Sequence, residues 1–243
     1  MQISEIFYSI QGEGKRSGFP CFFIRTNFCN LRCKFAGGNL CDTPYTSWNP
    51  GDKKNLGETE IDFIISECKK VNCTDAVITG GEPTMYPEEL TELCKKLKKT
   101  NKNIFITLET NGTYFGDFVK YVDLFSISPK LKSSVPFKTK YQKKHEKNRI
   151  NIDVLKKYNL YQISKNKDIQ WKFVFTSKED IEEIKELQTL AGFSDKNIYL
   201  MPEGITEKDL KKNRLKTIEE CIKNKYNYTD RIHILAWGNK RGV

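Results

Sequence analysis

The sequence predicts an α/β fold, a partial TIM-like barrel of about six parallel strand–helix units, in a single domain covering residues 1–243. Two observations support this fold class. Strand patterns and helix patterns alternate along the chain, which is typical of parallel βα units. Polar, glycine-rich stretches follow most of the strands, and barrels of this kind build their sites from loops at the carboxyl ends of the strands.

The individual elements follow from their residue patterns. Strands are predicted at residues 4–10, 21–26, 76–79, 103–108, 122–126, 169–176, 197–201 and 232–236, and helices at residues 59–71, 87–99, 152–158, 179–190 and 206–224. The helix at 59–71 shows an apolar stripe at helical spacing, and Thr206 can cap the last helix with Asp209 three residues on. Residues 132–149 show no clear period.

The polar stretches that follow these strands should all face one mouth of the barrel. They are the cysteine-containing loop at 29–43 and the segments 80–83, 109–112, 128–130 and 201–204. The turn at 11–14, which contains two glycines, has two open interpretations. It is either a simple hairpin turn or a polar loop whose Gln11 and Glu13 reach a ligand.

Arg25 interrupts the strand at 21–26, which is otherwise an almost continuous apolar run. Such a run is typical of a strand covered on both faces. An unpaired arginine is rare in a protein core, so we expect Arg25 either to pair with a carboxylate or to point into a site. Its guanidinium group can hold a carboxylate through two parallel hydrogen bonds.

Composition limits the partners and the compartment. The net charge is +10, from 41 basic and 31 acidic residues, but lysine-rich, solvated helix faces account for it, so we expect no nucleic-acid partner. No apolar run reaches the ~18 residues of a membrane span, and the first residues lack the regions of a signal peptide. Free, clustered cysteines indicate a reducing compartment. We therefore expect a cytoplasmic protein without a membrane partner.

Three cysteines lie close together in the chain, at Cys29, Cys33 and Cys41. Thiolates suit iron–sulfur clusters and zinc, and a saturated site of either kind normally takes four protein ligands. Three thiolates on an iron–sulfur cluster leave one iron with an open position that can hold a small molecule. The other five cysteines have no partner at ligand spacing and are expected to fill the core.

This loop resembles the radical S-adenosylmethionine superfamily, whose members hold a [4Fe-4S] cluster on a C-x3-C-x2-C loop. Cys29 and Cys33 match the first half of that pattern, but Ala36 stands at the third position. We interpret residues 37–41 as a five-residue insertion that makes Cys41 the third ligand. The segments Gly-Gly-Glu-Pro at 80–83 and Glu-Thr-Asn-Gly at 109–112 also resemble the superfamily.

A narrower resemblance follows from Ile-Gln-Gly-Glu-Gly at 10–14, Asp-Thr at 42–43, Ser-Pro-Lys at 128–130 and the tail Trp-Gly-…-Arg-Gly-Val. These segments are similar to those of the 7-carboxy-7-deazaguanine synthases. The resemblance implies an enzyme that converts 6-carboxy-5,6,7,8-tetrahydropterin to 7-carboxy-7-deazaguanine with loss of ammonia, a step toward queuosine and other deazapurines. It also implies a [4Fe-4S] cluster, S-adenosylmethionine and Mg²⁺ as cofactors.

The resemblance also assigns residues by position. The pterin would contact Ile10, Gln11, Gly12, Arg25, Thr79 and Val243, with Arg25 on its carboxylate. S-adenosylmethionine would contact Gly81, Ser128, Pro129, Lys130, Met201, Pro202, Glu203 and Gly204, and Thr43 would bind Mg²⁺. No side chain is expected to act as a catalytic group, because the radical comes from the cofactor. His145 and His233 are expected to be structural or surface residues.

Two other functions and two partners complete the expectations. The radical chemistry could instead serve an activating enzyme for a glycyl-radical protein. A third possibility is a zinc-stapled nucleic-acid-binding module that uses Cys29, Cys33, Cys41 and one distant ligand. For the synthase, the resemblance implies a homodimer and an electron donor such as flavodoxin or ferredoxin.

Overall fold

The computed structural model describes residues 1–243, and its strands form one continuous sheet. The strands are β1 (Gln2–Ile10), β2 (Pro20–Thr26), β3 (Gly57–Glu58), β4 (Asp75–Gly80), β5 (Phe105–Thr110), β6 (Leu124–Ile127), β7 (Asp168–Phe175), β8 (Ile198–Pro202) and β9 (Asn227–Tyr228). The helices are α1 (Pro44–Ser47), α2 (Ile61–Lys70), α3 (Pro87–Thr100), α4 (Gln142–Asn148), α5 (Ile152–Lys165), α6 (Lys178–Ala191), α7 (Glu207–Asn224) and α8 (Ile232–Trp237).

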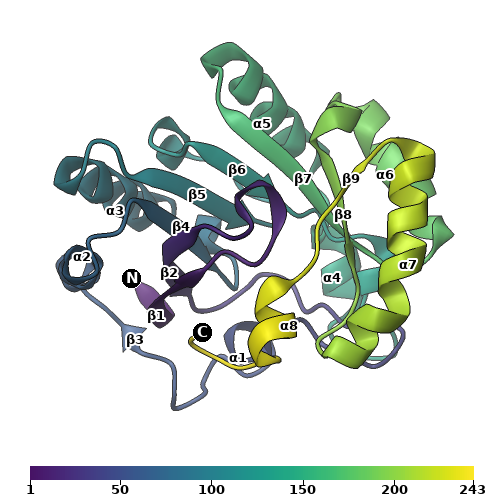
Figure 1. The fold of residues 1–243 in the computed structure, drawn as a ribbon, viewed down its shortest axis with the longest axis horizontal. Helices are drawn as coiled ribbons and strands as arrows, with labels where there is room; N and C mark the ends of the chain where they lie inside the picture. The colour runs from purple at the N-terminus through teal and green to yellow at the C-terminus, as the bar shows by residue number, and fades with distance from the viewer.

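The sheet is an open barrel, as the sequence predicts. Its spatial order is β3-β1-β2-β4-β5-β6-β7-β8-β9, and the end strands β3 and β9 do not pair with each other. All neighbours from β2 to β9 are parallel, whereas β1 and β3 are antiparallel additions at one edge. Figure 1 shows the strands fanning from β1 to β9, with the longer helices on the outer side. None of the helices combines the length and apolar character needed to cross a membrane.

The core lies between the sheet and the outer helices. A cluster of 40 buried side chains fills this layer. In β4, Ala76, Val77 and Ile78 are all buried, as expected of a parallel strand that is covered on both faces. The helices α2 and α3 turn their apolar stripes inward, and Ile64 and Leu90 have no exposed surface. This packing leaves the carboxyl ends of the strands free to carry polar loops.

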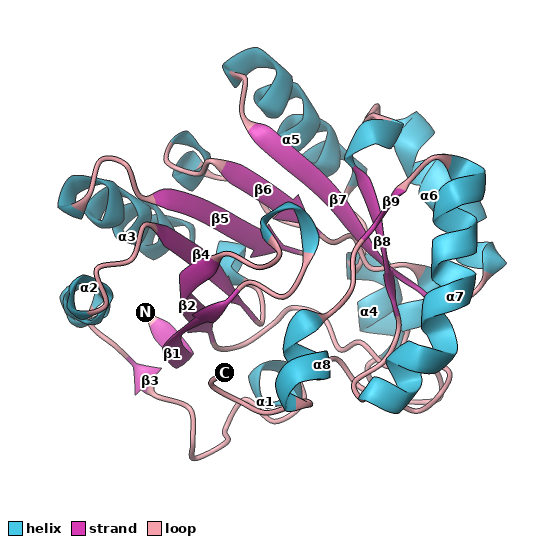
Figure 2. Cartoon of the chain, in the orientation of Figure 1, coloured by secondary structure: helices cyan, strands magenta, loops and turns pink.

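The predicted strand at 232–236 is wrong, because these residues belong to α8 (Figure 2). The two-residue strand β9 occupies the edge of β8 and ends the sheet on that side. The backbone N–H of Ile232 instead donates to the carbonyl of Gly12 at 3.0 Å. The segment therefore joins the β1–β2 turn, and only Ile234 of α8 is buried.

Other differences concern elements with weak patterns. Residues 132–149, which show no period, contain α4. The helix predicted at 152–158 is longer in the structure, where α5 continues to Lys165. Its second half exposes Leu160 and Ile163, so the sequence shows no clear apolar stripe there. The elements β3, β9 and α1 span only two to four residues, too few for periodicity to reveal. The capping of α7 is confirmed, since Thr206 Oγ1 accepts from the N–H of Asp209.

The end of β4 approaches the end of β2 so closely that only glycine fits. A Cβ atom on Gly80 would lie 2.3 Å from the carbonyl oxygen of Thr26, and one on Gly81 would lie 1.9 Å from that of Phe28. Gly80 also has a φ of +132°, which other residues rarely adopt. The N–H groups of Gly81 and Glu82 donate to Thr26 and Phe28 at 3.0 and 2.9 Å. The two glycines thus bring the cysteine loop next to β4.

Glu82, which follows Gly80 and Gly81, links the ends of two strands. Its carboxylate is completely buried and accepts hydrogen bonds from Thr84 N and Oγ1, Thr110 Oγ1 and Asn111 N at 3.1, 2.6, 2.6 and 2.7 Å. Burial raises the pKa of Glu82, and these four donors oppose that effect. The acidic residue of this motif therefore ties the end of β4 to the end of β5.

Gly81→Ala should lower the free energy of unfolding by about 1–3 kcal/mol, because the new methyl group must push the Phe28 carbonyl away. Urea unfolding of the purified protein measures the change. Gly51→Ala is the matched control, since no atom lies within 4 Å of the position that its methyl group would take and its φ is not positive. Equal unfolding midpoints for the two variants would contradict the close approach.

Candidate active site

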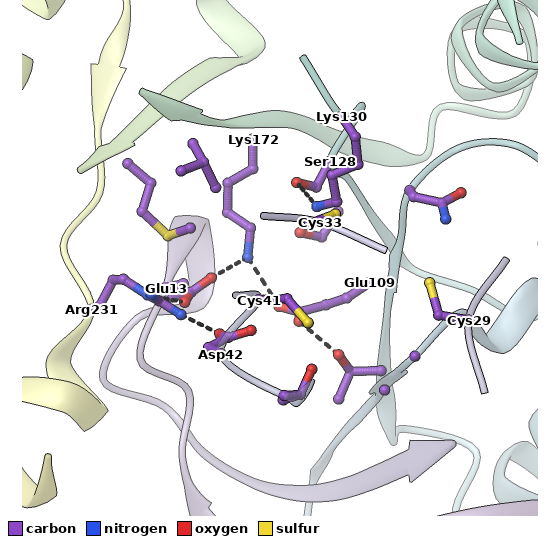
Figure 3. A pocket seen from close by; sticks show the side chains of 18 of the residues that line it. Glu13, Cys29, Cys33, Cys41, Asp42, Glu109, Ser128, Lys130, Lys172 and Arg231 are labelled. Carbon is purple, nitrogen blue, oxygen red and sulfur yellow. Dashed lines mark hydrogen bonds and ion pairs between the residues drawn. The ribbon is translucent and has the colours of Figure 1, made fainter. Parts of the chain in front are cut away.

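The polar segments at the strand ends meet in one cavity, which confirms the expectation that they share a mouth (Figure 3). The cavity is lined by the cysteine loop and by residues at the ends of β4, β5, β6 and β8. The turn between β1 and β2, the strand β7 and the helix α8 complete its walls. Side chains far apart in the chain therefore face one another across a single space.

Three cysteines from the loop after β2 face this cavity. Cys29, Cys33 and Cys41 all line it, whereas Ala36 lies in a different groove. The inserted residues fold back on themselves: the N–H of Phe35 donates to the carbonyl of Asn39 at 2.8 Å. This return places Cys41 beside Cys33, whose carbonyl accepts from the N–H of Cys41 at 3.2 Å. The insertion therefore supplies the thiol that Ala36 cannot.

Contacts outside the loop hold this arrangement. The indole Nε1 of Trp48 donates to the carbonyl of Cys33 at 3.1 Å, and Asn39 Nδ2 donates to Glu203 Oε1 at 2.9 Å. The N–H of Arg32 donates to Nδ1 of His145 at 3.2 Å. His145 is buried, and burial lowers its pKa to about 4, so the ring is a neutral acceptor at pH 7. His145 is structural, as expected, and braces the cysteine loop.

The three thiols need a bound cation to become thiolates. Burial raises the pKa of Cys29 and Cys33, and raises that of Cys41 to about 12, so without a cation all three stay protonated. Coordination to a metal deprotonates a thiol outright. None of the other five cysteines, Cys21, Cys68, Cys73, Cys94 and Cys221, lines the cavity, and all five are buried.

The spacing of the three sulfur atoms argues against zinc. Two thiolates on one zinc ion lie no more than about 4.6 Å apart, because each Zn–S bond is about 2.3 Å. Cys29, Cys33 and Cys41 do not form a group whose ligand atoms all lie within 4.8 Å of one another. They are too far apart for one ion but can each hold a separate iron of one cluster. The donor set of three thiols without a fourth cysteine fits a [4Fe-4S] cluster with one open iron.

Opposite the cysteines, charged side chains form a buried network (Figure 3). Lys172 of β7 pairs with Glu13 and lies 3.4 Å from Glu109 Oε1. The Nε atom of Arg231 donates to Glu13 Oε1 at 3.0 Å, and its terminal nitrogen pairs with Asp42. Each buried carboxylate thus has a cationic partner, which is what makes its burial tolerable.

These partners set the charge of the network. Burial by itself would raise the pKa of Glu13, but Lys172, Arg231 and His233 outweigh it and lower that pKa well below its usual range. Burial would likewise lower the pKa of Lys172, but Glu109 and Glu13 raise it above the ordinary lysine value. At pH 7 Glu13 is therefore an anion and Lys172 a cation. The pair is a fixed charge array and not a proton-exchanging group.

Glu109 connects this array to two predicted substrate contacts. Its Oε1 accepts from Gln11 Nε2 at 3.2 Å, and its Oε2 accepts from Thr79 Oγ1 at 3.0 Å. Both side chains line the cavity. Because Lys172 anchors Glu109 in turn, the orientation of Gln11 and Thr79 depends on the charge network behind them.

Arg25 both pairs with a carboxylate and lines the cavity. Its Nε donates to Glu5 Oε1 at 2.7 Å. Arg25 therefore meets both expectations from the sequence, because it pairs with a carboxylate and also lines a site. Its terminal nitrogens donate to no protein atom, although the side chain is mostly buried. The end of the guanidinium group is therefore free for an anionic ligand.

The predicted ligand contacts fall into two groups. Those that line the cavity are Gln11, Arg25, Thr79, Gly81, Ser128, Lys130, Met201, Glu203, Gly204 and Thr43. Those that do not are Ile10, Gly12, Pro129, Pro202 and Val243. Gly12 lies against α8, since a Cβ atom there would be 2.2 Å from His233 Nδ1. Pro129 instead lines a small neighbouring pocket behind Lys130.

Glu13, Asp42 and His233 lie within ligand distance of one another, but they do not look like a metal site. Arg231 already contacts both carboxylates, and a divalent cation there would have to displace its guanidinium group. Burial and Arg231 lower the pKa of His233, while Glu13 opposes them. We interpret the three residues as part of the ion-pair network.

Sequence reasoning missed several of these residues. Lys172 interrupts the apolar run of β7 just as Arg25 interrupts β2, so the same signal could have revealed it. Arg231 sits in a polar stretch before α8 and carries no such signal. His233, which the sequence suggests is a structural or surface residue, lines the cavity because its segment forms α8 and not a strand.

Comparisons with known proteins agree with this geometry. A family model described as the radical SAM superfamily matches residues 23–191. A 7-carboxy-7-deazaguanine synthase of Halobacterium salinarum is 34% identical, over 98% of this chain and 91% of the relative. One from Rhodopirellula baltica is 35% identical, over 99% of this chain and 88% of the relative.

Among solved structures, QueE from Escherichia coli has the same fold, with a TM-score of 0.65 and 23% identity over 94% of this chain and 92% of that one. The zinc-module alternative has no support among these matches. Both relatives cover nearly the whole chain. The chain therefore belongs to the radical SAM superfamily and, within it, to the family of 7-carboxy-7-deazaguanine synthases.

Proposed function

We propose that the protein converts 6-carboxy-5,6,7,8-tetrahydropterin to 7-carboxy-7-deazaguanine with loss of ammonia, as a radical S-adenosylmethionine enzyme. The observation that carries the proposal is the shared cavity. Three thiols without a fourth cysteine line it, and so does Arg25, whose terminal nitrogens make no hydrogen bond within the protein. The three cysteines suit a cluster with one open iron, and Arg25 suits a substrate that carries a carboxylate.

The chain's own residues have distinct roles in this proposal. Cys29, Cys33 and Cys41 would each hold one iron of the cluster. The reduced cluster would supply the electron that cleaves bound S-adenosylmethionine, and the radical formed from it would abstract a hydrogen atom from the substrate. S-adenosylmethionine would contact Gly81, Ser128, Lys130, Met201, Glu203 and Gly204, which line the cavity. Pro129 and Pro202 belong to the same proposed set, although they do not line the cavity in this structure. Phe35, Leu40 and Val174 add apolar surface to the same cavity and help to exclude water from the reacting atoms.

On the substrate side, Arg25 binds the pterin carboxylate, and Gln11 and Thr79 contact the ring. Ile10, Gly12 and Val243 belong to the same proposed set, although in this structure they do not line the cavity. Glu109, held by Lys172, keeps Gln11 and Thr79 in place. No side chain is required as an acid, base or nucleophile.

Thr43 is the proposed Mg²⁺ ligand. It lines the cavity next to Asp42 and is the N-cap residue of α1. A hydroxyl oxygen together with substrate oxygens and water suits this hard cation, which usually keeps several waters. The ion would steady the substrate carboxylate that Arg25 also binds.

The proposal extends to partners. We propose a homodimer and an electron donor of the flavodoxin or ferredoxin type, on the basis of the family resemblance, together with a cytoplasmic location. The activating-enzyme alternative is not favoured, because relatives covering nearly the whole chain are synthases by name.

Anaerobic turnover tests the proposed reaction. Iron-loaded protein, incubated with the carboxytetrahydropterin, S-adenosylmethionine, Mg²⁺ and a reductant, should form 7-carboxy-7-deazaguanine and release ammonia. Mass spectrometry of the product and an ammonia assay measure both. Cleavage of S-adenosylmethionine without consumption of the pterin would contradict the proposal and favour the activating-enzyme alternative.

Cys41→Ala should lose the cluster as completely as Cys29→Ala, because each thiol holds one iron. Wild-type protein should carry about four irons per chain, measured by iron and sulfide analysis after anaerobic purification. Cys221→Ala is the control and should retain the full cluster, since Cys221 lies in α7 and outside the cavity. A full complement of iron in Cys41→Ala would mean that the third ligand is another residue.

Thr43→Ala should keep its iron but weaken the response of turnover to Mg²⁺. Activity titrated against MgCl₂ should reach half-saturation at a higher concentration, with a reduced maximum. Thr46→Ser keeps a hydroxyl in the same helix turn and serves as the control. An unchanged Mg²⁺ titration for Thr43→Ala would remove this residue from the metal site.

A further inference from the structure

The carboxyl tail is fastened to β1 by a single side chain. Arg241 donates from Nε to Glu5 Oε2 at 3.0 Å, and its terminal nitrogen donates to Ser4 O, Lys54 O and Asn55 Oδ1 at 3.0, 3.0 and 2.7 Å. Its guanidinium carbon also lies 4.2 Å from the centre of the Tyr45 ring. None of the residues in this dense set of contacts lines the cavity.

Glu5, which Arg241 contacts, is the same carboxylate that holds Arg25. One carboxylate oxygen accepts from Arg25 Nε and from the Tyr45 hydroxyl, both at 2.7 Å, and the other accepts from Arg241. Two cations thus share one anion. The three charged side chains are between 11 and 20% exposed, so solvent screens their interactions only in part.

We propose that Arg241 is a positioning residue for substrate recognition, which acts through Glu5 to leave the positive charge of Arg25 available to the substrate carboxylate. This inference rests on the proposed function, in which Arg25 binds that carboxylate. Arg241 offsets part of the negative charge of Glu5, so Glu5 neutralises less of the charge of Arg25. The three side chains together carry one net positive charge.

The geometry gives this role a direction. Glu5 holds Arg25 through Nε only, so the terminal nitrogens of this cavity-lining residue make no hydrogen bond within the protein. Without Arg241, Glu5 would have Arg25 as its sole cationic partner, and the pair would be neutral. Asp52 Oδ1 lies 3.7 Å from Arg241 NH1 at the outer side of the tail and does not contact Arg25. Loss of Arg241 should therefore weaken binding of an anion at Arg25 and leave uncharged parts of the site unaffected.

A comparison of two ligands tests the inference. Dissociation constants of 6-carboxy- and 6-methyl-5,6,7,8-tetrahydropterin are measured on the cluster-loaded enzyme with S-adenosylmethionine bound. Arg241→Gln should raise the constant for the carboxypterin about tenfold, the size expected for weakening one partly buried charge interaction. The constant for the methylpterin should not change. Arg241→Lys should recover part of the loss, and KM should rise while kcat at saturation is retained.

Lys240→Gln is the matched control, because it removes a neighbouring positive charge that makes no ion pair. Equal weakening of both pterins by Arg241→Gln would show that the tail only shapes the pocket, and no change for either would show that Arg241 is not coupled to the site; both results overturn the inference. If wild-type enzyme itself fails to prefer the carboxypterin, the role of Arg25 in the proposed function falls as well, a result that the variants do not produce.

Discussion

The return of the chain between Cys33 and Cys41 is the constraint on which the rest of the site depends. A main-chain hydrogen bond joins the two cysteines, and the indole of Trp48 donates to the same carbonyl of Cys33. The return brings a thiol to the cavity that Ala36 could not supply, and it makes the donor set three. Three thiols without a fourth cysteine fit a [4Fe-4S] cluster that keeps one iron open.

The parallel sheet provides the second half of the arrangement. Because β2 and β4 to β8 all end on the same side, residues from five loops converge without any of them being close in the chain. Gly80 and Gly81 allow the cysteine loop to approach β4, and Glu82 then locks β4 to β5. Backbone contacts thus hold the cysteine loop in place, while the side chains that line the cavity remain free to contact ligands.

Behind the substrate side lies a set of shared charges. Lys172 links Glu13 to Glu109, and Glu109 accepts hydrogen bonds from Gln11 and Thr79, two polar side chains that line the cavity. Glu5 links Arg25 to Arg241 in a similar way. In both cases an ion pair next to the cavity orients a side chain that lines the cavity. Such networks hold geometry well because every buried charge is paired, and their members are costly to remove singly.

Much of this was readable from the sequence, and the misses have physical causes. The long elements and the convergence of strand ends follow from periodicity, which needs several residues to show. The segment Ile232 to Trp237 is apolar enough to predict a strand, but it folds as α8 and its N–H at Ile232 donates to the β1–β2 turn, a contact that no local pattern reveals. Lys172 interrupts an apolar strand, a local signal of a site residue. Arg231 has no such signal, because its partners Glu13 and Asp42 lie far away in the chain.

The sequence by itself determined the order of the longer strands and helices, the three thiols and the polar residues at the strand ends, because these depend on local pattern and residue chemistry. Only the tertiary structure decided which charges meet and which predicted contacts line the cavity. Ion pairs such as that between Arg241 and Glu5 join opposite ends of the chain. Their partners are chosen by distance in space, and no local pattern encodes that distance.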